Sequence, residues 1–343
     1  MAHVAVNIVA WNSMRHLPET LASIAAQTHK DLSLMIIDNA SSDDVLDFVR
    51  SEYPQAMILR NTQNTGFSRA HNQGIAHVRA HCQDPENTYV LVTNPDIVLE
   101  PNYVEVLVSE MSRRSDVGSG GGKILKLYPN QDELGQGLRS GRFDSTGLKV
   151  TRGRRVADRA AGEEDAGAHD RTEEVFGVSG ALAMYRVSAL DDVALNGEYF
   201  DEDFFAYKED VDIAWRLRLR GWKSLYVPGA VAHHYRTAAG RDRASKLETA
   251  FNPRRRLRHV NFYSYRNHLL TLVKNEHVGN FLRDMPRIGW YEFQKFAFVA
   301  CLEQRTMKGL VDFFRRLPRA YEKRRLIMSR ATVRPGEIRK WFA

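Results

Sequence analysis

The sequence predicts an α/β fold in which a mostly parallel central sheet is flanked by helices. Two observations lead to this prediction. Short apolar segments of strand character alternate with segments of helical periodicity through the first hundred residues or so, and such alternation is typical of a doubly wound sheet. Polar residues directly follow several of the apolar segments, at the sheet edge where open α/β folds bind ligands. The 343 residues suffice for one large domain and an appendage.

The predicted elements follow one another in strand–helix order. The first strand covers residues 3–10 and precedes a helix at 17–26, in which Leu17, Leu21 and Ile24 share one face. A second helix is expected at 66–80. The other strands are short apolar runs expected at residues 32–37, 57–59 and 88–93.

Three of these strands end beside polar side chains, at Asn12, Asp38 and Asp96. Pro95 cannot donate to a strand ladder, so the strand before it ends and leaves Asp96 just beyond its carboxyl end. We therefore expect the three polar residues to lie along one rim of the sheet. A carboxylate there suits a hard divalent cation that holds a diphosphate. The alternative is an Asn-Pro-Asp turn without a ligand.

An acidic segment at residues 199–212 is the second candidate site. It holds six carboxylates within twelve residues, interrupted by a single cation. Ionised groups packed this closely repel one another, so cations, a metal or hydrogen bonds must compensate them, or one must stay protonated. Interleaved aromatic residues favour burial in a cleft over a solvated acidic loop. The segment is therefore a candidate acid/base or metal site.

Together with further motifs, these residues resemble family 2 glycosyltransferases of the GT-A fold, particularly the bacterial rhamnosyltransferase-like members. The resemblance covers roughly residues 3–275. Each motif is weak alone, but their order and spacing are specific. In chain order the motifs are Val9-Ala10-Trp11-Asn12, Asp38-Asn39-Ala40-Ser41-Ser42-Asp43, the segment 64–74, Asn94-Pro95-Asp96, Gly177-Val178-Ser179-Gly180-Ala181, Glu209-Asp210-Val211-Asp212, His234 and Tyr263-Ser264-Tyr265-Arg266-Asn267.

The resemblance implies a nucleotide-sugar site on the first half of the chain. Asp38 is expected to accept the pyrimidine N–H of the nucleotide. Gly66 would allow close backbone approach, and Arg69 would offer a cation to phosphate. The other residues expected in this donor site are Asn12, Asn39, Asn64, Asn72, Asn94 and Asp96.

The resemblance also implies a divalent cation, Mg²⁺ or Mn²⁺. Asp96 stands where the family has an Asp-x-Asp metal motif, here reduced to one carboxylate. Mg²⁺ usually takes only one or two protein carboxylates besides phosphate oxygens. The second expected ligand is His234, six residues after Pro228, with His233 as the alternative. Imidazole somewhat favours Mn²⁺ and similar ions.

Asp210 matches the catalytic base of the family, which takes the proton of the acceptor hydroxyl. A single displacement by that hydroxyl inverts the anomeric centre, which implies an inverting hexosyltransferase. The residues expected to position the backbone or the acceptor are Glu209, Asp212, Arg216 and Arg266.

The net charge of +7 conceals an asymmetry that suggests two regions, 1–250 and 251–343. The second carries 21 Lys and Arg against seven Asp and Glu, a net charge of +14, which leaves −7 for the first. Its basic residues mix with aromatics, and amphipathic helices are expected at 290–301 and 309–317. Such faces fit an anionic membrane surface; the alternative is a helical appendage that packs on the core. We expect adsorption to weaken when the charge is reversed at six basic residues, Arg315, Arg316, Arg319, Lys323, Arg324 and Arg325.

The remaining expectations concern location and substrate. Two cysteines and no apolar run near eighteen residues predict a cytoplasmic chain, on the inner face of the plasma membrane if the basic region adsorbs. We expect a nucleoside-diphosphate sugar donor, best dTDP-L-rhamnose, and a glycan or lipid-linked acceptor. A UDP-hexose donor and a non-catalytic sugar-nucleotide-binding protein are the alternatives. No nucleic-acid partner is expected, and a homo-oligomer is left open. Segments 118–122 and 157–170 are expected to be flexible, in a long loop or lid.

Overall fold

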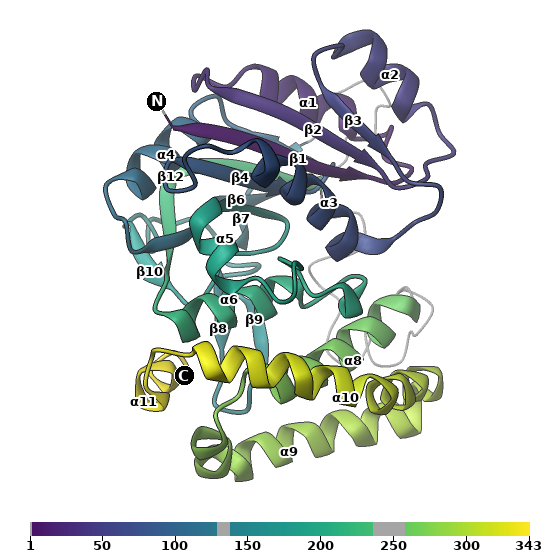
Figure 1. The fold of residues 1–343 in the computed structure, drawn as a ribbon, viewed down its shortest axis with the longest axis vertical. Coiled ribbons are helices and arrows are strands. Elements are labelled where there is room, and N and C mark those ends of the chain that lie inside the picture. Colours follow the sequence, from purple (N-terminus) through teal and green to yellow (C-terminus); the bar gives the residue numbers. More distant parts are fainter. Residues whose placement is uncertain (1, 129–137, 236–257) are drawn as a thin grey trace.

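The computed structural model describes residues 2–128, 138–235 and 258–343, and within them a ten-stranded sheet forms the centre of the molecule (Figure 1). Its main strand order is β10-β12-β6-β11-β4-β1-β2-β3, while β5 pairs with β12 and β7 with β6. The strands of this sheet are β1 His3–Ala10, β2 Leu32–Asp38, β3 Met57–Arg60, β4 Thr88–Thr93, β5 Ile97–Leu99, β6 Val117–Tyr128, β7 Leu138–Ser145, β10 Glu173–Val175, β11 Leu182–Arg186 and β12 Lys223–Tyr235.

The N-terminal half of the sheet confirms the predicted fold class. β4, β1, β2 and β3 are mutually parallel, and the register places Ala10 of β1 opposite Asp38 of β2. The carboxyl ends of these strands therefore meet at one rim. The predicted strands at 3–10 and 88–93 have the observed bounds, and the other two extend one residue further.

Helices cover both faces of the sheet because its central strands alternate their buried side chains. Leu91 of β4 belongs to a core cluster with residues of α1, α2 and α4, whereas Val92 packs with α3, α5 and α6 on the other face. The bounds of these helices are α1 Leu17–Ala25, α2 Val45–Glu52, α3 Gly66–His81, α4 Tyr103–Ser112, α5 Val187–Val193 and α6 Glu209–Arg220.

The expectation of flexible loops at 118–122 and 157–170 is wrong for the first segment and wrong in part for the second. Residues 118–122 are a buried part of β6. A Cβ on Gly122 would lie 2.0 Å from the carbonyl oxygen of Ala230 and 2.6 Å from the ring of Tyr103. The glycine thus permits close packing rather than mobility. The second segment begins in β9 (Val156–Asp158), which pairs with β8 (Leu148–Val150).

A helical region follows the sheet, as predicted, on the side of α6 away from the N-terminal half (Figure 1). Its helices are α8 Arg258–Asn275, α9 Val278–Leu302, α10 Met307–Arg330 and α11 Pro335–Arg339. α9 and α10 run through Pro286 and Pro318 and so exceed the predicted lengths. Each proline lacks the N–H that would bond the carbonyl group one turn earlier in the helix. Because both prolines are exposed, water can donate to that carbonyl group instead. None of the helices described combines the length and apolar character needed to cross a membrane.

Candidate active site

Asp210 faces a pocket of about 400 Å³ at the carboxyl-end rim of the sheet. It lies in the first turn of α6, after Lys208, whose φ of 72° turns the chain into the helix. The pocket is also lined by Asn94, directly after β4, by His234 of β12 and by Ser264 of α8. The structure thus brings together residues that lie 170 positions apart in the sequence.

Two backbone N–H groups hold the carboxylate of Asp210. Gly180 donates to Oδ2 at 3.1 Å, and Val211 donates to Oδ1 at 2.8 Å. A Cβ on Gly180 would lie 3.0 Å from the Cβ of Asp210, so a larger residue would crowd this contact. The helix N-terminus also favours a negative charge at this position. These contacts fix the orientation of the Asp210 carboxylate at the pocket.

Glu209, its neighbour, is buried and lacks a cation at contact distance among the described residues. Burial, and secondly the charge of Asp210, raise the pKa of Glu209 to about 8, and its Oε2 has no hydrogen-bond partner. Its carboxyl group is consequently neutral near pH 7. A protonated carboxyl group was one of the ways expected to reduce repulsion between the carboxylates of this segment.

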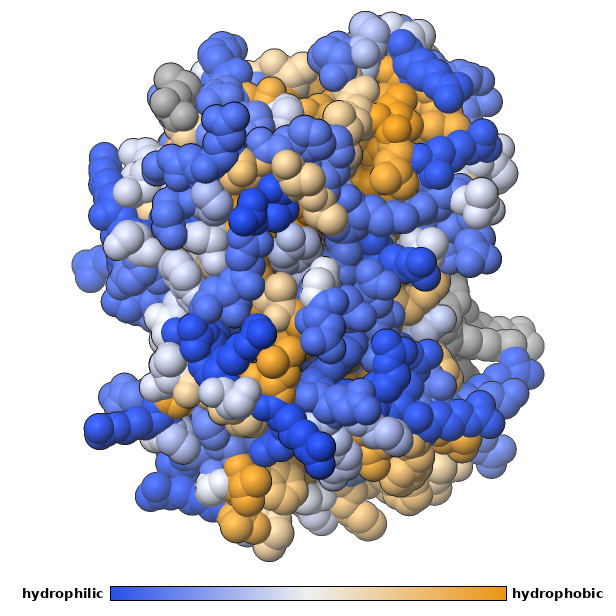
Figure 2. Space-filling view, in the orientation of Figure 1, coloured by the Kyte–Doolittle hydropathy of each residue, from blue (hydrophilic) through white to orange (hydrophobic). Residues whose placement is uncertain are grey.

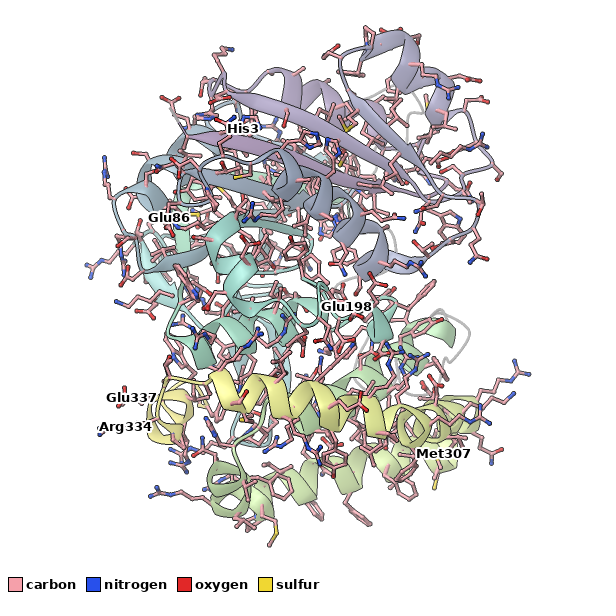
Figure 3. The ribbon with its side chains drawn as sticks, viewed as in Figure 1. His3, Glu86, Glu198, Met307, Arg334 and Glu337 are labelled. Atoms are coloured by element: carbon pink, nitrogen blue, oxygen red, sulfur yellow. The ribbon has the colours of Figure 1, made fainter. Side chains whose placement is uncertain are left out.

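Cations from the C-terminal helices pair with three other acidic residues of the segment, Asp201, Asp203 and Asp212. Lys323 of α10 lies 2.6 Å from Asp201 and 3.1 Å from Asp203, and its Nζ also contacts Glu198 at 2.9 Å. Arg316 lies 2.7 Å from Asp203. In Figure 3, Glu198 lies between the sheet and α10.

Lys274 of α8 forms ion pairs with Asp201 and, at 2.7 Å, with Asp212. Burial alone would raise the pKa of Asp212, but Lys274 and Arg216 outweigh it and lower that pKa. Arg216 also donates to the carbonyl oxygens of Val193 and Tyr199. Asp212 and Arg216 are thus buried on the inner side of α6, where Arg216 holds backbone carbonyl groups and Asp212 pairs with Arg216 and Lys274.

Arg266 and Asn267 of α8 hold the backbone of the acidic segment from below. Arg266 donates to the carbonyl oxygens of residues 203 and 204, and it pairs with Asp312 of α10 at 2.6 Å. Asn267 donates to the carbonyl oxygens of residues 204, 206 and 207, at 2.7 to 2.9 Å. Both residues therefore shape the loop that leads into Asp210. Their side chains contact the backbone of that loop and not the carboxylate of Asp210.

His234 and Asp96 meet at the pocket. The Nε2 of His234 lies 3.3 Å from Oδ1 of Asp96, and its Nδ1 lies 2.8 Å from Oδ2 of Asp144. Burial would lower the pKa of His234, but the two carboxylates outweigh it and raise the pKa to about 9. His233, the alternative ligand, points to the other face of β12, where it contacts Glu100 at 3.0 Å.

The donor set of Asp96 and His234 fits a divalent cation that is completed by diphosphate oxygens and water. Oδ1 of Asp96 is buried without a hydrogen-bond partner and faces Nε2 of His234. Asp144 can accept from Nδ1–H, which leaves Nε2 for a metal, as is usual for histidine ligands. Among the described residues no cluster of three or more such ligands occurs, so two protein ligands suit a phosphate-bound ion.

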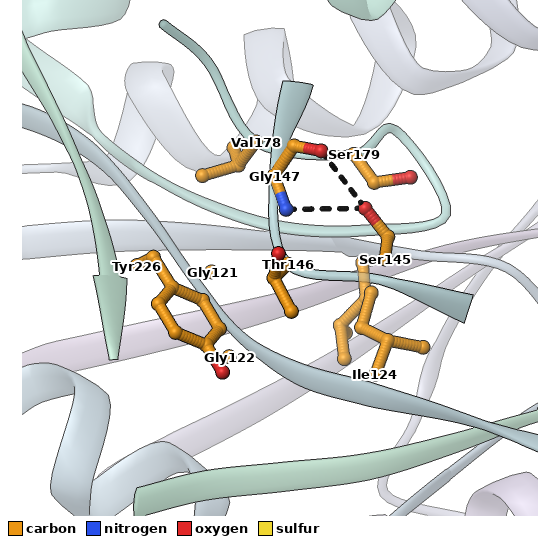
Figure 4. Close-up of a pocket in the computed structure, with 10 residues that line it drawn as sticks. Gly121, Gly122, Ile124, Ser145, Thr146, Gly147, Val178, Ser179 and Tyr226 are labelled. Atoms are coloured by element: carbon orange, nitrogen blue, oxygen red, sulfur yellow. Dashed lines mark hydrogen bonds between the residues drawn. The ribbon is translucent and has the colours of Figure 1, made fainter. Parts of the chain in front are cut away.

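Asp144 was not predicted as a site residue, because nothing in its local sequence marks it. It lies at the end of β7, immediately before a tight turn into β8. Figure 4 shows this turn: the Gly147 N–H donates to Oγ of Ser145 at 3.1 Å, and that hydroxyl donates to the Gly147 carbonyl. Gly147 has a φ of 111°, which favours glycine. The turn fixes Asp144 beside His234.

Asp38 has an unused acceptor at the other end of the rim. Its side chain is fully buried, Oδ1 accepts from the Ser41 N–H at 2.9 Å, and Oδ2 has no hydrogen-bond partner. Arg60 lies 3.5 Å from Oδ2. Oδ2 therefore keeps the capacity to accept a hydrogen bond from a ligand, which is the role predicted for Asp38.

Three of the predicted donor-site residues, Asn39, Asn64 and Asn72, form hydrogen bonds with other residues of the protein. The amide of Asn39 contacts Asn64 at 2.9 Å and accepts from both the N–H and the hydroxyl of Thr65. Asn72 bonds the backbone N–H and C=O of Phe200. Their side chains therefore act by positioning the loops around α3.

The remaining donor-site residues lie around the same loops. Asn12 accepts from the N–H of Ser42 at 2.8 Å and thus joins the loops after β1 and β2. Gly66, with a φ of 82°, lies against Phe205: a Cβ there would be 2.4 Å from the Phe205 carbonyl oxygen. In the structure its close approach is to the backbone and ring of Phe205. Arg69 is exposed and lies 3.8 Å from Glu202.

The fold and this rim of carboxylates define the class of protein: a glycosyltransferase with the GT-A fold. Two solved structures share the fold, Staphylococcus aureus TarS 1–349 in complex with UDP and GalNAc-T7 with UDP, GalNAc and Mn²⁺. The TarS match covers 99% of this chain and 89% of the other, with a TM-score of 0.53 and 14% identity. The GalNAc-T7 match has a TM-score of 0.57 and 12% identity, and covers 80% of this chain but 48% of that one.

The chain belongs to glycosyltransferase family 2: the family's sequence model, "Glycosyltransferase like family 2", matches residues 2–261. A Mycobacterium tuberculosis protein, N-acetylglucosaminyl-diphospho-decaprenol L-rhamnosyltransferase, is 31% identical over 248 residues, which cover 70% of this chain and 78% of that protein. A Staphylococcus aureus poly-beta-1,6-N-acetyl-D-glucosamine synthase is 21% identical over 65% of this chain and 48% of its own length. The predicted family and fold are thereby confirmed.

Proposed function

We propose that this glycosyltransferase moves L-rhamnose from dTDP-L-rhamnose onto a hydroxyl of a lipid-linked, cell-surface glycan intermediate. The observation that carries the reaction type is Asp210, which faces the same pocket as His234. The choice of sugar and acceptor is supported by the 31% identity with the mycobacterial protein, whose name specifies a rhamnosyl group and a decaprenol-linked acceptor.

In this proposal Asp210 removes the proton of the acceptor hydroxyl. The hydroxyl oxygen then forms the new bond to the anomeric carbon as the bond to the diphosphate breaks on the opposite side. One such displacement inverts the anomeric centre. The hydrogen bonds from Gly180 and Val211 keep the carboxylate aimed at the pocket, and protonated Glu209 adds no second charge beside it.

Asp96 and His234 would hold Mg²⁺ or Mn²⁺ against the donor diphosphate. When bound, such an ion offsets the negative charge of the leaving group. Asp38 would accept the N–H of the thymine ring through Oδ2, which forms no hydrogen bond within the protein. Asn94 would line the pocket between these two ends.

A UDP-hexose is the alternative donor, because the two solved structures described above contain UDP. Uracil and thymine present the same N–H to Asp38, so that contact favours neither. A panel of nucleotide sugars, each tested by thermal shift with Mg²⁺ and with Mn²⁺, separates them. The bound donor raises the melting temperature by mass action. Stabilisation by UDP-sugars alone would contradict a dTDP-linked donor.

The same proposal predicts that Asp210→Asn lowers transfer by about 10²- to 10⁴-fold while donor affinity changes little. Asp47→Asn, at an exposed position of α2, is the matched control. Transfer by the Asp210 variant within a few-fold of wild type would remove Asp210 from the role of base. The separate outcome that wild type shows no transfer with any donor in the panel would favour the non-catalytic sugar-nucleotide-binding alternative.

A further inference from the structure

Large apolar side chains left exposed gather on the C-terminal helices. Among the described residues, twelve of the sixteen such side chains lie between positions 278 and 321. Figure 2 shows apolar surface along the lower end of the molecule, where α9 runs in Figure 1. Those on α9 are Val278, Phe281, Leu282, Met285, Trp290, Phe293, Phe296, Phe298 and Leu302.

α9 has an outer face that is apolar and positively charged. The helix buries Asn280, Asp284, Ile288 and Val299 on one side. Its two acidic residues face the protein: Asp284 pairs with Arg154 and Arg339, and Glu292 contacts His268 of α8 at 2.6 Å. The charged side chains that α9 does expose are Arg283 and Arg287. A helix that only packed on the domain would be expected to turn polar residues outward.

Contacts with the rest of the protein hold α9 in place, so its outer face has a fixed position. α9 lies on the side of α8 and α10 away from the sheet (Figure 1). The buried pairs of Asp284 and the contact between His268 and Glu292 fix it to the rest of the chain. At 25 residues it is about 37 Å long, so it can lie along a surface.

The basic residues first expected to adsorb to a membrane are mostly engaged elsewhere. Arg316, Arg319 and Lys323 pair with Asp203, and Arg324 donates to the carbonyl oxygens of residues 273 and 276. Reversing their charge would disturb the loop that leads to Asp210. The positive charge that α9 itself exposes to a partner is that of Arg283 and Arg287.

We propose that the outer face of α9 docks flat on an anionic phospholipid bilayer. Phe and Trp side chains would enter the boundary between headgroups and acyl chains, while the two arginines bind headgroup phosphates. A second copy of the chain is a weaker candidate, because a symmetric contact along α9 would bring equal positive charges together. This inference deepens the proposed function, since a bilayer is where a lipid-linked acceptor resides.

The position of α9 would place the active-site pocket close to the bilayer. Ser264 of α8 lines the active-site pocket, and α9 is fixed to α8 through His268. Packed helix axes lie about 8–10 Å apart, so the bilayer would lie about one helix layer beyond α8. An acceptor whose lipid stays in that bilayer could then extend its sugar into the pocket.

Vesicle co-sedimentation without any sugar nucleotide tests the proposal separately from the donor assignment. Wild type should pellet with vesicles of phosphatidylglycerol and phosphatidylcholine, and remain in the supernatant with phosphatidylcholine alone. The double variant Trp290→Ser/Phe293→Ser should bind at least about tenfold more weakly. Arg283→Gln/Arg287→Gln should lose about 30-fold at low salt and less at high salt.

Exposed residues at the far end of the molecule provide the matched controls, Met57→Ser on β3 and Arg50→Gln on α2, and should bind as wild type does. Unchanged melting temperatures would show that all variants fold. Equal sedimentation of wild type with both vesicle types, or no loss in the α9 variants, would overturn the proposal. So would a dimer in sedimentation velocity that Trp290→Ser/Phe293→Ser dissociates, since the face would then bind a second copy.

Discussion

Lys323→Met is the most direct test of how the C-terminal helices support the active site. Lys323 is 5% exposed, and its Nζ contacts three carboxylates, those of Glu198, Asp201 and Asp203. Methionine keeps much of the apolar stem but removes the charge. Breaking a buried ion pair by removing one partner typically costs about 3–5 kcal/mol.

The cost should fall near the lower end of that range, at about 3 kcal/mol of unfolding free energy. Lys274 remains beside Asp201, and Arg316 remains beside Asp203. Arg325→Met is the control: it removes a cation from an exposed position two residues along α10, and exposed changes of this kind usually stay within about 0.5 kcal/mol.

The pH dependence gives a second measure of the same contact. Burial would lower the pKa of Lys323 and raise that of Asp201, but their attraction outweighs burial and shifts both the opposite way. The raised lysine pKa stabilises the fold below the unfolded value of about 10.4, and the lowered aspartate pKa stabilises it above about 3.9. The deficit of Lys323→Met should therefore be full from about pH 5 to 9 and shrink as the pH falls below about 4.

Urea unfolding followed by tryptophan fluorescence at several pH values measures this deficit. Transfer activity should fall in parallel, because Asp201 and Asp203 lie in the loop that precedes Asp210. A free energy of unfolding for Lys323→Met equal to that of Arg325→Met would refute the reasoning. So would a deficit that persists unchanged at pH 3.

Three further predictions concern the rim. Asp38→Asn should weaken binding of the bare nucleoside monophosphate by about 10- to 150-fold, since a hydrogen bond to a charged group contributes about 1.5–3 kcal/mol; unchanged affinity by calorimetry would exclude it as the base acceptor. Asp144→Asn should lower metal-dependent affinity for the diphosphate by about 10- to 100-fold, with metal-free affinity unaffected. Glu209→Gln should remove a decline in stability between pH 4.5 and about 8, because the raised pKa makes folded wild type bind the extra proton across that window. A variant whose unfolding free energy still falls over this range would contradict a buried, protonated Glu209.

The N-terminal sheet could be predicted from sequence because its signals are local. Strands 3–10 and 88–93 are apolar runs with clear ends; Asp38 is the last residue of β2, and Asp96 follows β4 after Asn94 and Pro95. In a parallel sheet such ends must share an edge. The rim could therefore be foreseen without any knowledge of which strands are neighbours.

The partners of the site could not be predicted, because they depend on contacts between distant segments. Asp144 reaches His234 across 90 positions, and Lys323 reaches Asp201 across 122. The glycines of β6 were misjudged for a related reason: glycine indicates flexibility in isolation, but Gly122 is required by the proximity of Ala230 and Tyr103. Composition showed that the acidic segment needed compensation, and only the fold shows which groups provide it.

The ion pairs that join the acidic loop to α8 and α10 limit the exchange of C-terminal helices between related enzymes. The family match ends at residue 261, yet Lys274, Arg316 and Lys323 lie beyond it and neutralise carboxylates before it. A chimera that takes its C-terminal helices from a relative would leave those carboxylates buried without counter-charge unless the donor helices supply cations at the same places. The C-terminal helices can thus acquire new outer surfaces freely, whereas their inner surfaces must change together with the catalytic loop.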